Sequence, residues 1–325
     1  MLILVATDRE VVVIDVERGA GSPAHGITGR PTCLTADPLV HGRAWCGTNR
    51  NGVFRTDDGG RSWQLVGLAG ALIMAVSASP TDPDAVWVGT EPSEVWRSGD
   101  AGLTWQQTSP LETLSSSSDW SFPPRPDTHH VRWMACHPLE PERLWVAIEA
   151  GALVSTIDGG RTWNDRVAGG PWDTHELAIH RKAPDTLCVS AGDGYFESDD
   201  AGATWRSPSV GLEVGYLRSV AIDPDQPEAI VVSASSGPHS AYVAGRSDGR
   251  LYRRLTRERW ERVREGWPEP ASTIAPLLCT GVKAGELWAA DERGLHRSDD
   301  GGMSWRRAVG YATSPQHLRG LALMR

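Results

Sequence analysis

The stretch Thr56-Asp57-Asp58-Gly59-Gly60-Arg61-Ser62-Trp63 is repeated along the chain. The shared pattern is Ser or Thr, then Asp two residues later, Gly two residues after the Asp, and a second Ser or Thr followed by Trp. Full copies also lie at 98–105, 156–163, 198–205 and 298–305, and a sixth copy, which ends at Trp260, has lost the Asp and the Gly. Self-similarity at regular intervals is the signature of a repeat architecture, so we expect one recurring structural unit throughout the chain.

Each residue of the motif suits a tight turn between two antiparallel strands. The Asp side chain can accept hydrogen bonds from backbone N–H groups, the flanking hydroxyls can bond the backbone locally, and the Gly permits a positive φ. The Trp then begins the return strand and packs on the hairpin. Because turn chemistry accounts for every residue in it, we interpret the motif as structural. Four further Trp residues occupy equivalent positions in strands that precede copies of the motif: Trp45, Trp87, Trp145 and Trp288.

The spacing of the motif predicts the architecture. Successive motif Trp residues from Trp63 to Trp305 are 42, 58, 42, 55 and 45 residues apart, as expected for propeller blades of about 40–50 residues. The residues before Trp63 and after Trp305 together supply two blades, one marked by Trp63 and one that closes the ring. We therefore predict an all-β fold, a seven-bladed β-propeller with four-stranded antiparallel blades, as a single domain over 1–325. The closing blade is expected to be shared between the termini, with its innermost strand at 317–324, because closure removes exposed strand edges.

The motif resembles the Asp-box, or bacterial neuraminidase repeat, and the resemblance covers essentially the whole chain. It implies a fold and not an activity. Families that share the repeat include sialidases, xyloglucan-type endoglucanases, sortilin-like receptors and photosystem II assembly factors. Arg132, Arg218 and Arg319 resemble the triad that sialidases offer to a substrate carboxylate, but this sequence lacks an assignable nucleophilic Tyr and a Phe/Tyr-Arg-Ile-Pro segment. The endoglucanases use two propellers around a cleft, whereas one propeller is predicted here.

Cationic side chains are expected at one mouth of the central channel. In propellers, function usually lies where the loops that lead into the innermost strands meet the loops between the second and third strands. Alignment of the blades places Arg132, Arg218 and Arg319 in one register on innermost strands, and His175 occupies the same slot in another blade. We expect these four side chains to bind a polar or anionic ligand, since Arg makes bidentate contacts with carboxylates.

Polar and acidic residues are expected around the same mouth. They follow the second strands at equivalent slots: Asp8, Asn49, Glu91, Glu149, Asp193, Ser235 and Glu292. Paired carboxylates can act as acid and base, so Glu91, Glu149 and Asp193 are the candidate catalytic residues if the protein is an enzyme. The alternative is that these charges satisfy one another across a wet channel, as mixed-charge surfaces often do.

Two connections carry further candidates. The long connection 110–131 contains Trp120 and ends in an Asp-Thr-His triplet at His129, and the next blade repeats that triplet just after Trp172. Long loops in compact folds are often lids or binding loops. We therefore include Trp120, Trp172 and His129 among the candidate ligand-binding residues.

An insertion at 235–246 is predicted to lie at the same mouth of the channel as these two connections. It adds His239 to the candidate ligand-binding residues. A metal site built from His129, His175 and Glu149 is an alternative that we consider, although their spacing matches no known ligand signature. We expect no metal and no cofactor.

Composition excludes several classes. The net charge of −9 argues against nucleic acid as a partner. No stretch approaches the ~18 apolar residues that span a bilayer, and the first residues lack the features of a secretory signal, so we expect a cytoplasmic protein with no membrane partner. The five Cys residues include no Cys-x-x-Cys pair, which argues against a disulfide framework or a zinc knuckle.

Two functions remain open. The first is a non-catalytic binding or assembly propeller whose mouth binds a small polar or anionic ligand or a protein segment. The second is a glycoside hydrolase or lyase that acts on a carbohydrate-like substrate with the mouth carboxylates as acid and base. An enzyme of this kind needs two carboxyl groups about 5 to 9.5 Å apart in a deep pocket, whereas a binding scaffold should present a flatter face.

Overall fold

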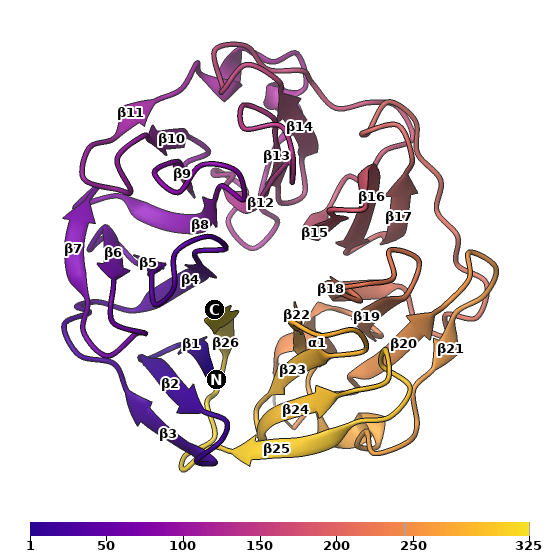
Figure 1. The fold of residues 1–325 in the computed structure, drawn as a ribbon. Coiled ribbons are helices and arrows are strands. Elements are labelled where there is room, and N and C mark those ends of the chain that lie inside the picture. Colours follow the sequence, from indigo (N-terminus) through magenta and orange to yellow (C-terminus); the bar gives the residue numbers. More distant parts are fainter. Residues whose placement is uncertain (244, 325) are drawn as a thin grey trace.

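The structure, a computed structural model, describes residues 1–243 and 245–324. Within these residues, seven antiparallel sheets are arranged in a ring around a central axis, as Figure 1 shows. The protein is an all-β, seven-bladed propeller, which confirms the fold predicted from the repeat spacing. We number blades 1 to 6 in chain order and call the seventh the closing blade.

The closing blade combines both ends of the chain, as the sequence predicts. From the axis outwards it consists of β26 (Leu318–Met324), β1 (Leu2–Thr7), β2 (Val11–Asp15) and β3 (Ala20–Pro23). Strand β26 pairs with β1 in an antiparallel register that places Ala322 opposite Leu4. Figure 1 shows the two termini together near the centre of the ring. Because the last strand is hydrogen-bonded to the first, the ring is closed at this blade.

Four of the remaining blades also have four strands each. Blade 1 consists of β4 (Pro31–Ala36), β5 (Ala44–Thr48), β6 (Val53–Thr56) and β7 (Gln64–Gly67). Blade 2 consists of β8 (Leu72–Ala78), β9 (Val86–Glu91), β10 (Val95–Ser98) and β11 (Gln106–Gln107). Blade 5 consists of β18 (Tyr216–Ile222), β19 (Ile230–Ser235), β20 (Arg250–Arg254) and β21 (Glu261–Arg262). Blade 6 consists of β22 (Leu277–Thr280), β23 (Leu287–Asp291), β24 (Gly294–Ser298) and β25 (Arg306–Gly310).

Blades 3 and 4 have a shortened outer edge. Blade 3 consists of β12 (Val131–Cys136), β13 (Leu144–Ile148) and β14 (Ala152–Thr156). Blade 4 consists of β15 (Thr174–His180), β16 (Ala183–Ala191) and β17 (Gly194–Ser198). In each blade an isolated antiparallel bridge, Ser155–Asn164 or Glu197–Arg206, lies at the place of the fourth strand.

Helical segments are short and lie in connections. They are the 3-10 turns Leu111–Thr113, Ser117–Asp119 and Pro270–Ser272 and the helix α1 (Pro238–Tyr242). In the described part of the chain, none of these helices is long and apolar enough to cross a membrane.

The repeated motif forms the turn that its residues predict. Thr56 Oγ1 donates to Asp58 Oδ1 (2.8 Å), and the Ser62 N–H and hydroxyl donate to the two oxygens of the same carboxylate (3.0 and 2.6 Å). Gly60 has a φ of +89°, and a Cβ on it would lie 2.5 Å from the Leu4 side chain, so glycine is required there. The carboxylate at the equivalent position makes the same contacts in the other full copies: Asp100, Asp158, Asp200 and Asp300.

Indole N–H groups connect neighbouring blades. Trp45 in blade 1 is fully buried, and its Nε1 donates to the Ala101 carbonyl in the motif of blade 2 (3.1 Å). Trp145 in blade 3 makes the same contact with Ala201 of blade 4 (3.3 Å). In the opposite direction, the motif residue Trp105 donates to Val66 of the preceding blade (3.1 Å). Some of the abundant Trp residues therefore join neighbouring blades, whereas motif residues such as Trp63 and Trp305 donate to a carbonyl of their own turn.

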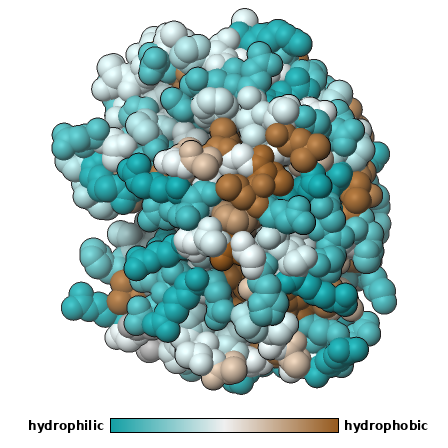
Figure 2. Space-filling model, turned by 90° about the vertical axis from the view of Figure 1, so that its left-hand side faces the viewer, coloured by the Kyte–Doolittle hydropathy of each residue, from teal (hydrophilic) through white to brown (hydrophobic). Residues whose placement is uncertain are grey.

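Apolar side chains fill the spaces between blades. Between the closing blade and blade 1, for example, Leu4 and Val13 pack against Leu34, Phe54 and Trp63. The outer surface is more polar: Figure 2 shows the side of the ring that carries β7 as mostly hydrophilic, with hydrophobic residues gathered in a band across its middle. The core thus lies between the sheets, which leaves the axial channel free for polar residues.

Candidate functional site at the channel mouth

Blades 2, 3 and 4 contribute one group of residues to the mouth of the channel. In blade 2, Glu91 ends β9, and in blade 3, His130 precedes β12 and Glu149 follows β13. In blade 4, Asp173 precedes β15 and His175 lies at the start of that strand. Figure 1 shows β12, β15 and β18 as the strands of blades 3, 4 and 5 nearest the axis, so residues at their beginnings converge there.

Glu149 is at the centre of this group. Its Oε2 lies 2.6 Å from His130 Nε2 and 3.6 Å from Arg132 Nε, and its Oε1 lies 3.9 Å from His175 Nε2. Burial would raise the pKa of the Glu149 carboxyl, but the hydrogen bond from His130 and the charge of Arg132 outweigh it and lower the pKa to about 2. Glu149 is therefore ionised at neutral pH.

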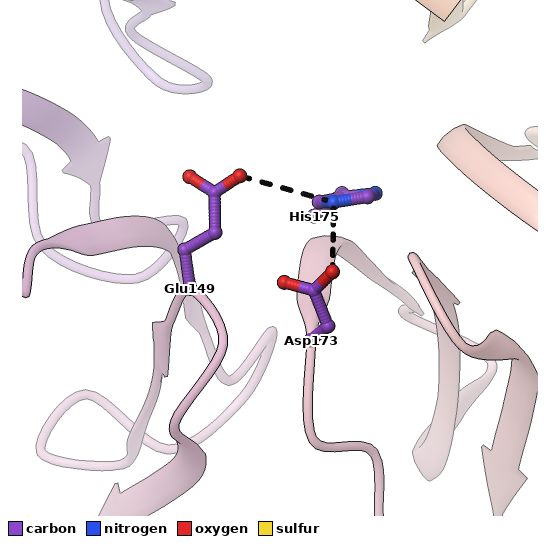
Figure 3. Close-up of side chains that lie close together, drawn as sticks. All are labelled: Glu149, Asp173 and His175. Carbon is purple, nitrogen blue, oxygen red and sulfur yellow. Dashed lines mark ion pairs between the residues drawn. The ribbon is translucent and has the colours of Figure 1, made fainter. Parts of the chain in front are cut away.

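His175 is fully buried with a defined orientation. Its Nδ1 lies 2.5 Å from the Leu217 carbonyl oxygen, and because a carbonyl only accepts, Nδ1 carries the hydrogen. Its Nε2 faces the Asp173 carboxylate (3.6 Å), Glu149 and the Tyr216 hydroxyl (3.4 Å). Burial lowers the pKa of His175, which favours the neutral imidazole with its lone pair on Nε2. Figure 3 shows Glu149 and Asp173 directed at this ring.

Asp173 faces His175 and Glu149 from the loop that leads into blade 4. Its Oδ1 accepts the Ala150 N–H (2.9 Å), so the loops of blades 3 and 4 are joined by this hydrogen bond. Burial and the nearby charge of Glu149 raise the pKa of the Asp173 carboxyl, although His175 opposes this. One ligand-type atom from each of Glu149, Asp173 and His175 lies within 4.8 Å of the others.

The predicted arginines occupy different environments. Arg132 is about one-quarter exposed beside Glu149. Arg218 is buried, its Nη atoms donate to the Ala275 and Leu318 carbonyls (2.6 and 2.9 Å), and its guanidinium lies 4.5 Å from the centre of the Tyr242 ring. Arg218 therefore joins blade 5 to blade 6 and the closing blade.

Arg319 on β26 is exposed and makes no hydrogen bond or ion pair with the described residues. Partial desolvation and then the charge of Arg132 lower the pKa of Arg319, and the charge of Arg30 acts in the same direction. Asp8 and Tyr242 oppose this effect. Arg319 is thus a free cation close to other cations.

Of the remaining predicted residues, Glu91 and Asp193 border the Glu149 group, and Glu91 Oε2 lies 3.9 Å from His130 Nδ1. Glu91 accepts a bidentate contact from Arg125 of the long connection (2.6 and 3.1 Å). Asp193 is exposed, and its Oδ1 lies 3.4 Å from the Asp173 N–H. Trp172 is 45% exposed beside this loop, and His239 is exposed on α1.

Trp120 and His129 lie apart from the Glu149 group. Trp120 is buried in the core of blades 2 and 3, and its Nε1 donates to Ser116 (3.0 Å). The ring of His129 stands edge-on to Trp120, 5.6 Å away. In the described residues, the cluster with the geometry of a metal site contains Asp173 in place of His129.

Sequence reasoning missed Glu176, His130 and Tyr242. Glu176 is buried in β15, accepts the Ser219 hydroxyl (2.5 Å), and burial raises its pKa to about 8 although Ser219, Arg132 and Arg218 oppose this. The available signal was a carboxylate that directly precedes the apolar residues of an innermost strand. For His130, the only signal in the sequence was its position next to His129. Tyr242 lies on the short helix α1, which the sequence did not predict.

No family model matches the sequence, and no curated protein matches it. Solved structures do resemble the fold. The GH74 enzyme of Niastella koreensis is 14% identical with a TM-score of 0.72, over 95% of this chain and 52% of that chain. The GH74 xyloglucanase from Xanthomonas campestris is 15% identical with a TM-score of 0.72, over 99% of this chain and 52% of that chain. YCF48 bound to a D1 peptide is 19% identical with a TM-score of 0.60, over 86% of this chain and 82% of that chain.

The chain spans 39% of an ancestral GH74 enzyme and about half of the other two GH74 chains. At these identities the likeness shows the propeller fold alone. The similar structures include both enzymes and a peptide-bound protein, so the chain is placed among β-propellers whose fold serves catalysis as well as binding.

Proposed function

We propose that the channel mouth binds an anionic group, such as a carboxylate of a protein segment or of a small polar molecule, without catalysis. The observation that carries this proposal is Arg319, an exposed residue whose guanidinium has no hydrogen-bond or ion-pair partner among the described residues. An unpaired guanidinium offers two parallel N–H donors that match a carboxylate.

The surrounding charges favour an anion at this place. Arg132 and Arg30 lie close enough to Arg319 to lower its pKa. Asp8 offsets part of this positive charge. Glu149 is already bound by His130 and Arg132, and Glu176 holds its proton at neutral pH, so these two acids offset little more of it. A bound carboxylate would relieve the mutual repulsion of the arginines.

Two further considerations support a binding role. YCF48, which shares the fold, is described as bound to a D1 peptide, so a protein segment is a reasonable ligand for this chain as well. The five copies of the turn motif support membership of the Asp-box repeat proteins, as one domain over 1–325. We also propose a cytoplasmic location, which cell fractionation tests.

Titration of the purified protein with an acidic peptide and with its amide-substituted counterpart tests the anion site. Arg319→Ala is expected to weaken binding of the acidic peptide by about 10-fold or more, since a charge-assisted hydrogen bond contributes about 1.5–3 kcal/mol. Arg181→Ala is the matched control, because Arg181 is exposed just beyond the other end of β15. Equal affinities of the wild type, Arg319→Ala and Arg181→Ala would contradict the proposal.

A glycoside hydrolase is the second candidate, and one observation favours it. Oxygens of Glu149 and Asp173 lie within 4.8 Å of each other, close to the carboxyl separation of about 5–5.5 Å in retaining glycosidases. Their environments also move the two pKa values apart, as in an acid and nucleophile pair. Hydrolysis of xyloglucan or other polysaccharides that is lost in Glu149→Gln and Asp173→Asn would favour this function over binding alone.

A further inference from the structure

We propose that Glu149, Asp173 and His175 bind one divalent transition-metal ion of the zinc type at the channel mouth. This site is separate from the anion site proposed at Arg319 and does not depend on it. The two carboxylates and the imidazole come from neighbouring blades and are directed at one another (Figure 3). His175 Nε2 lies 3.6 Å from Asp173 Oδ2 and 3.9 Å from Glu149 Oε1.

The atoms that face away from the cluster are each held by another group. Glu149 Oε2 is bound by His130 (2.6 Å), Asp173 Oδ1 accepts the Ala150 N–H (2.9 Å), and His175 Nδ1 donates to the Leu217 carbonyl (2.5 Å). Metal ligands in proteins are oriented by such outer partners, which fix the ring and the tautomer of a histidine. Here they leave one oxygen or nitrogen on each residue directed at the cluster, and of these the His175 nitrogen also has the weak contact with the Tyr216 hydroxyl.

The orientation of the groups also suits a cation. Nδ1 of His175 donates to the Leu217 carbonyl, so the lone pair of the neutral imidazole is on the inner nitrogen. The two carboxylates face each other within 4.8 Å, and a dication between them would offset their repulsion. With Arg132 beside Glu149, these groups carry one net negative charge, so a bound dication would leave a positive charge for an anion or a water at its open position.

The donor set selects among metals. One imidazole and two carboxylates suit zinc and other late first-row ions better than magnesium or calcium, which prefer oxygen ligands alone. Zinc bonds of about 2.0–2.2 Å place neighbouring ligands about 3.4 Å apart, so the donors must approach by a few tenths of an ångström or more. Binding also replaces the weak contact of the Tyr216 hydroxyl with His175 Nε2 (3.4 Å).

Calorimetric titration of the chelator-treated full chain with zinc chloride tests the site. We expect saturable binding of one ion per chain, weakened about 10-fold or more in Asp173→Asn, in keeping with the loss of a ligand. Asp225→Asn is the matched control, because Asp225 is an exposed carboxylate that pairs with Lys182 just beyond the other end of β15. Absence of a one-to-one isotherm in the wild type, or equal affinity in Asp173→Asn and the wild type, would overturn the proposal.

Two further measurements do not depend on a variant that folds. In a zinc-soaked crystal, an anomalous peak between the three donor atoms supports the site, and a peak only elsewhere overturns it. Cobalt in place of zinc should give visible absorption bands of a four- or five-coordinate ion, whereas the weak bands of the hexaaqua ion would contradict a protein-held metal. Both readouts use the metal alone, so failure of anion binding at Arg319 would leave them unchanged.

Discussion

The Nε2 atom of His130 lies 2.6 Å from Oε2 of Glu149, and both side chains are largely buried. His130 leads into the innermost strand of blade 3, whereas Glu149 follows the next strand. The pair therefore joins the two loops with which this blade lines the channel mouth. It also holds the carboxylate in place before any ligand arrives.

Glu149→Gln should lower the free energy of unfolding at pH 7 by about 1–3 kcal/mol, because it removes the ionised partner of His130 and Arg132. The pKa of Glu149 in the folded protein, about 2, lies below the ordinary 4.5. Its stabilisation is therefore fully present above pH 4.5 and is lost as the pH falls through about 2. Urea denaturation at several pH values should show the difference from wild type shrinking below pH 4.5; a constant difference would argue against an ionic contribution.

Glu176→Gln should behave in the opposite way. The folded-state pKa of Glu176, about 8, lies above the ordinary 4.5, so the folded protein keeps a proton that the unfolded chain releases between these values. The free energy of unfolding should consequently fall between pH 4.5 and pH 8 in the wild type, by an amount on the order of 5 kcal/mol. The variant keeps a neutral group beside Ser219 and should lose this dependence. If its melting temperature followed that of the wild type from pH 5 to pH 9, the carboxyl would be ionised throughout.

Asp58→Ala should destabilise blade 1 by about 2 kcal/mol, since it leaves the Thr56 and Ser62 donors of the turn without their acceptor. Asp57→Ala is the matched control, because Asp57 contacts only the Arg55 side chain at the surface (3.0 Å). Thermal denaturation of both variants measures the difference. Equal losses would mean that the conserved position of the motif contributes no more than its variable neighbour.

Trp45→Phe should cost about 1–3 kcal/mol, because it leaves a gap in the core and removes the N–H donor to Ala101 of the next blade. Trp96→Phe is the control within the same ring, since the indole of Trp96 donates to the exposed Glu94 carboxylate (3.1 Å). Chemical denaturation should rank Trp45→Phe as the less stable of the two. The reverse order would contradict a role of the indole contacts in holding the blades together.

Much of the fold was predictable because its signals are local. A turn of the type around Asp58 needs particular residues within eight positions, so it can be recognised in the sequence without reference to distant contacts. The same repeat predicts that His175 lies on an innermost strand and that Glu149 follows the second strand of its blade. The structure does bring these two side chains together, at 3.9 Å.

The partners of the candidate site residues were less predictable. Arg218 was expected to face a ligand, yet its Nη atoms bind carbonyls of two other blades. Trp120 lies in the same long connection as His129 and is buried in the core. Both outcomes depend on how irregular connections pack across blades, and the repeat carries no information about those connections.

The sequence by itself determined the number of blades and the turn between the outer strands of most of them. It also determined that the two ends of the chain close the ring. These features were predictable because hydrogen bonding within a blade depends on short, repeated stretches of sequence. Only the tertiary structure decided which charges meet at the mouth. The Glu149, Asp173 and His175 group and the unpaired Arg319 are assembled from three blades. Their contacts depend on the angle and spacing between neighbouring sheets, which arise from packing of side chains far apart in the chain.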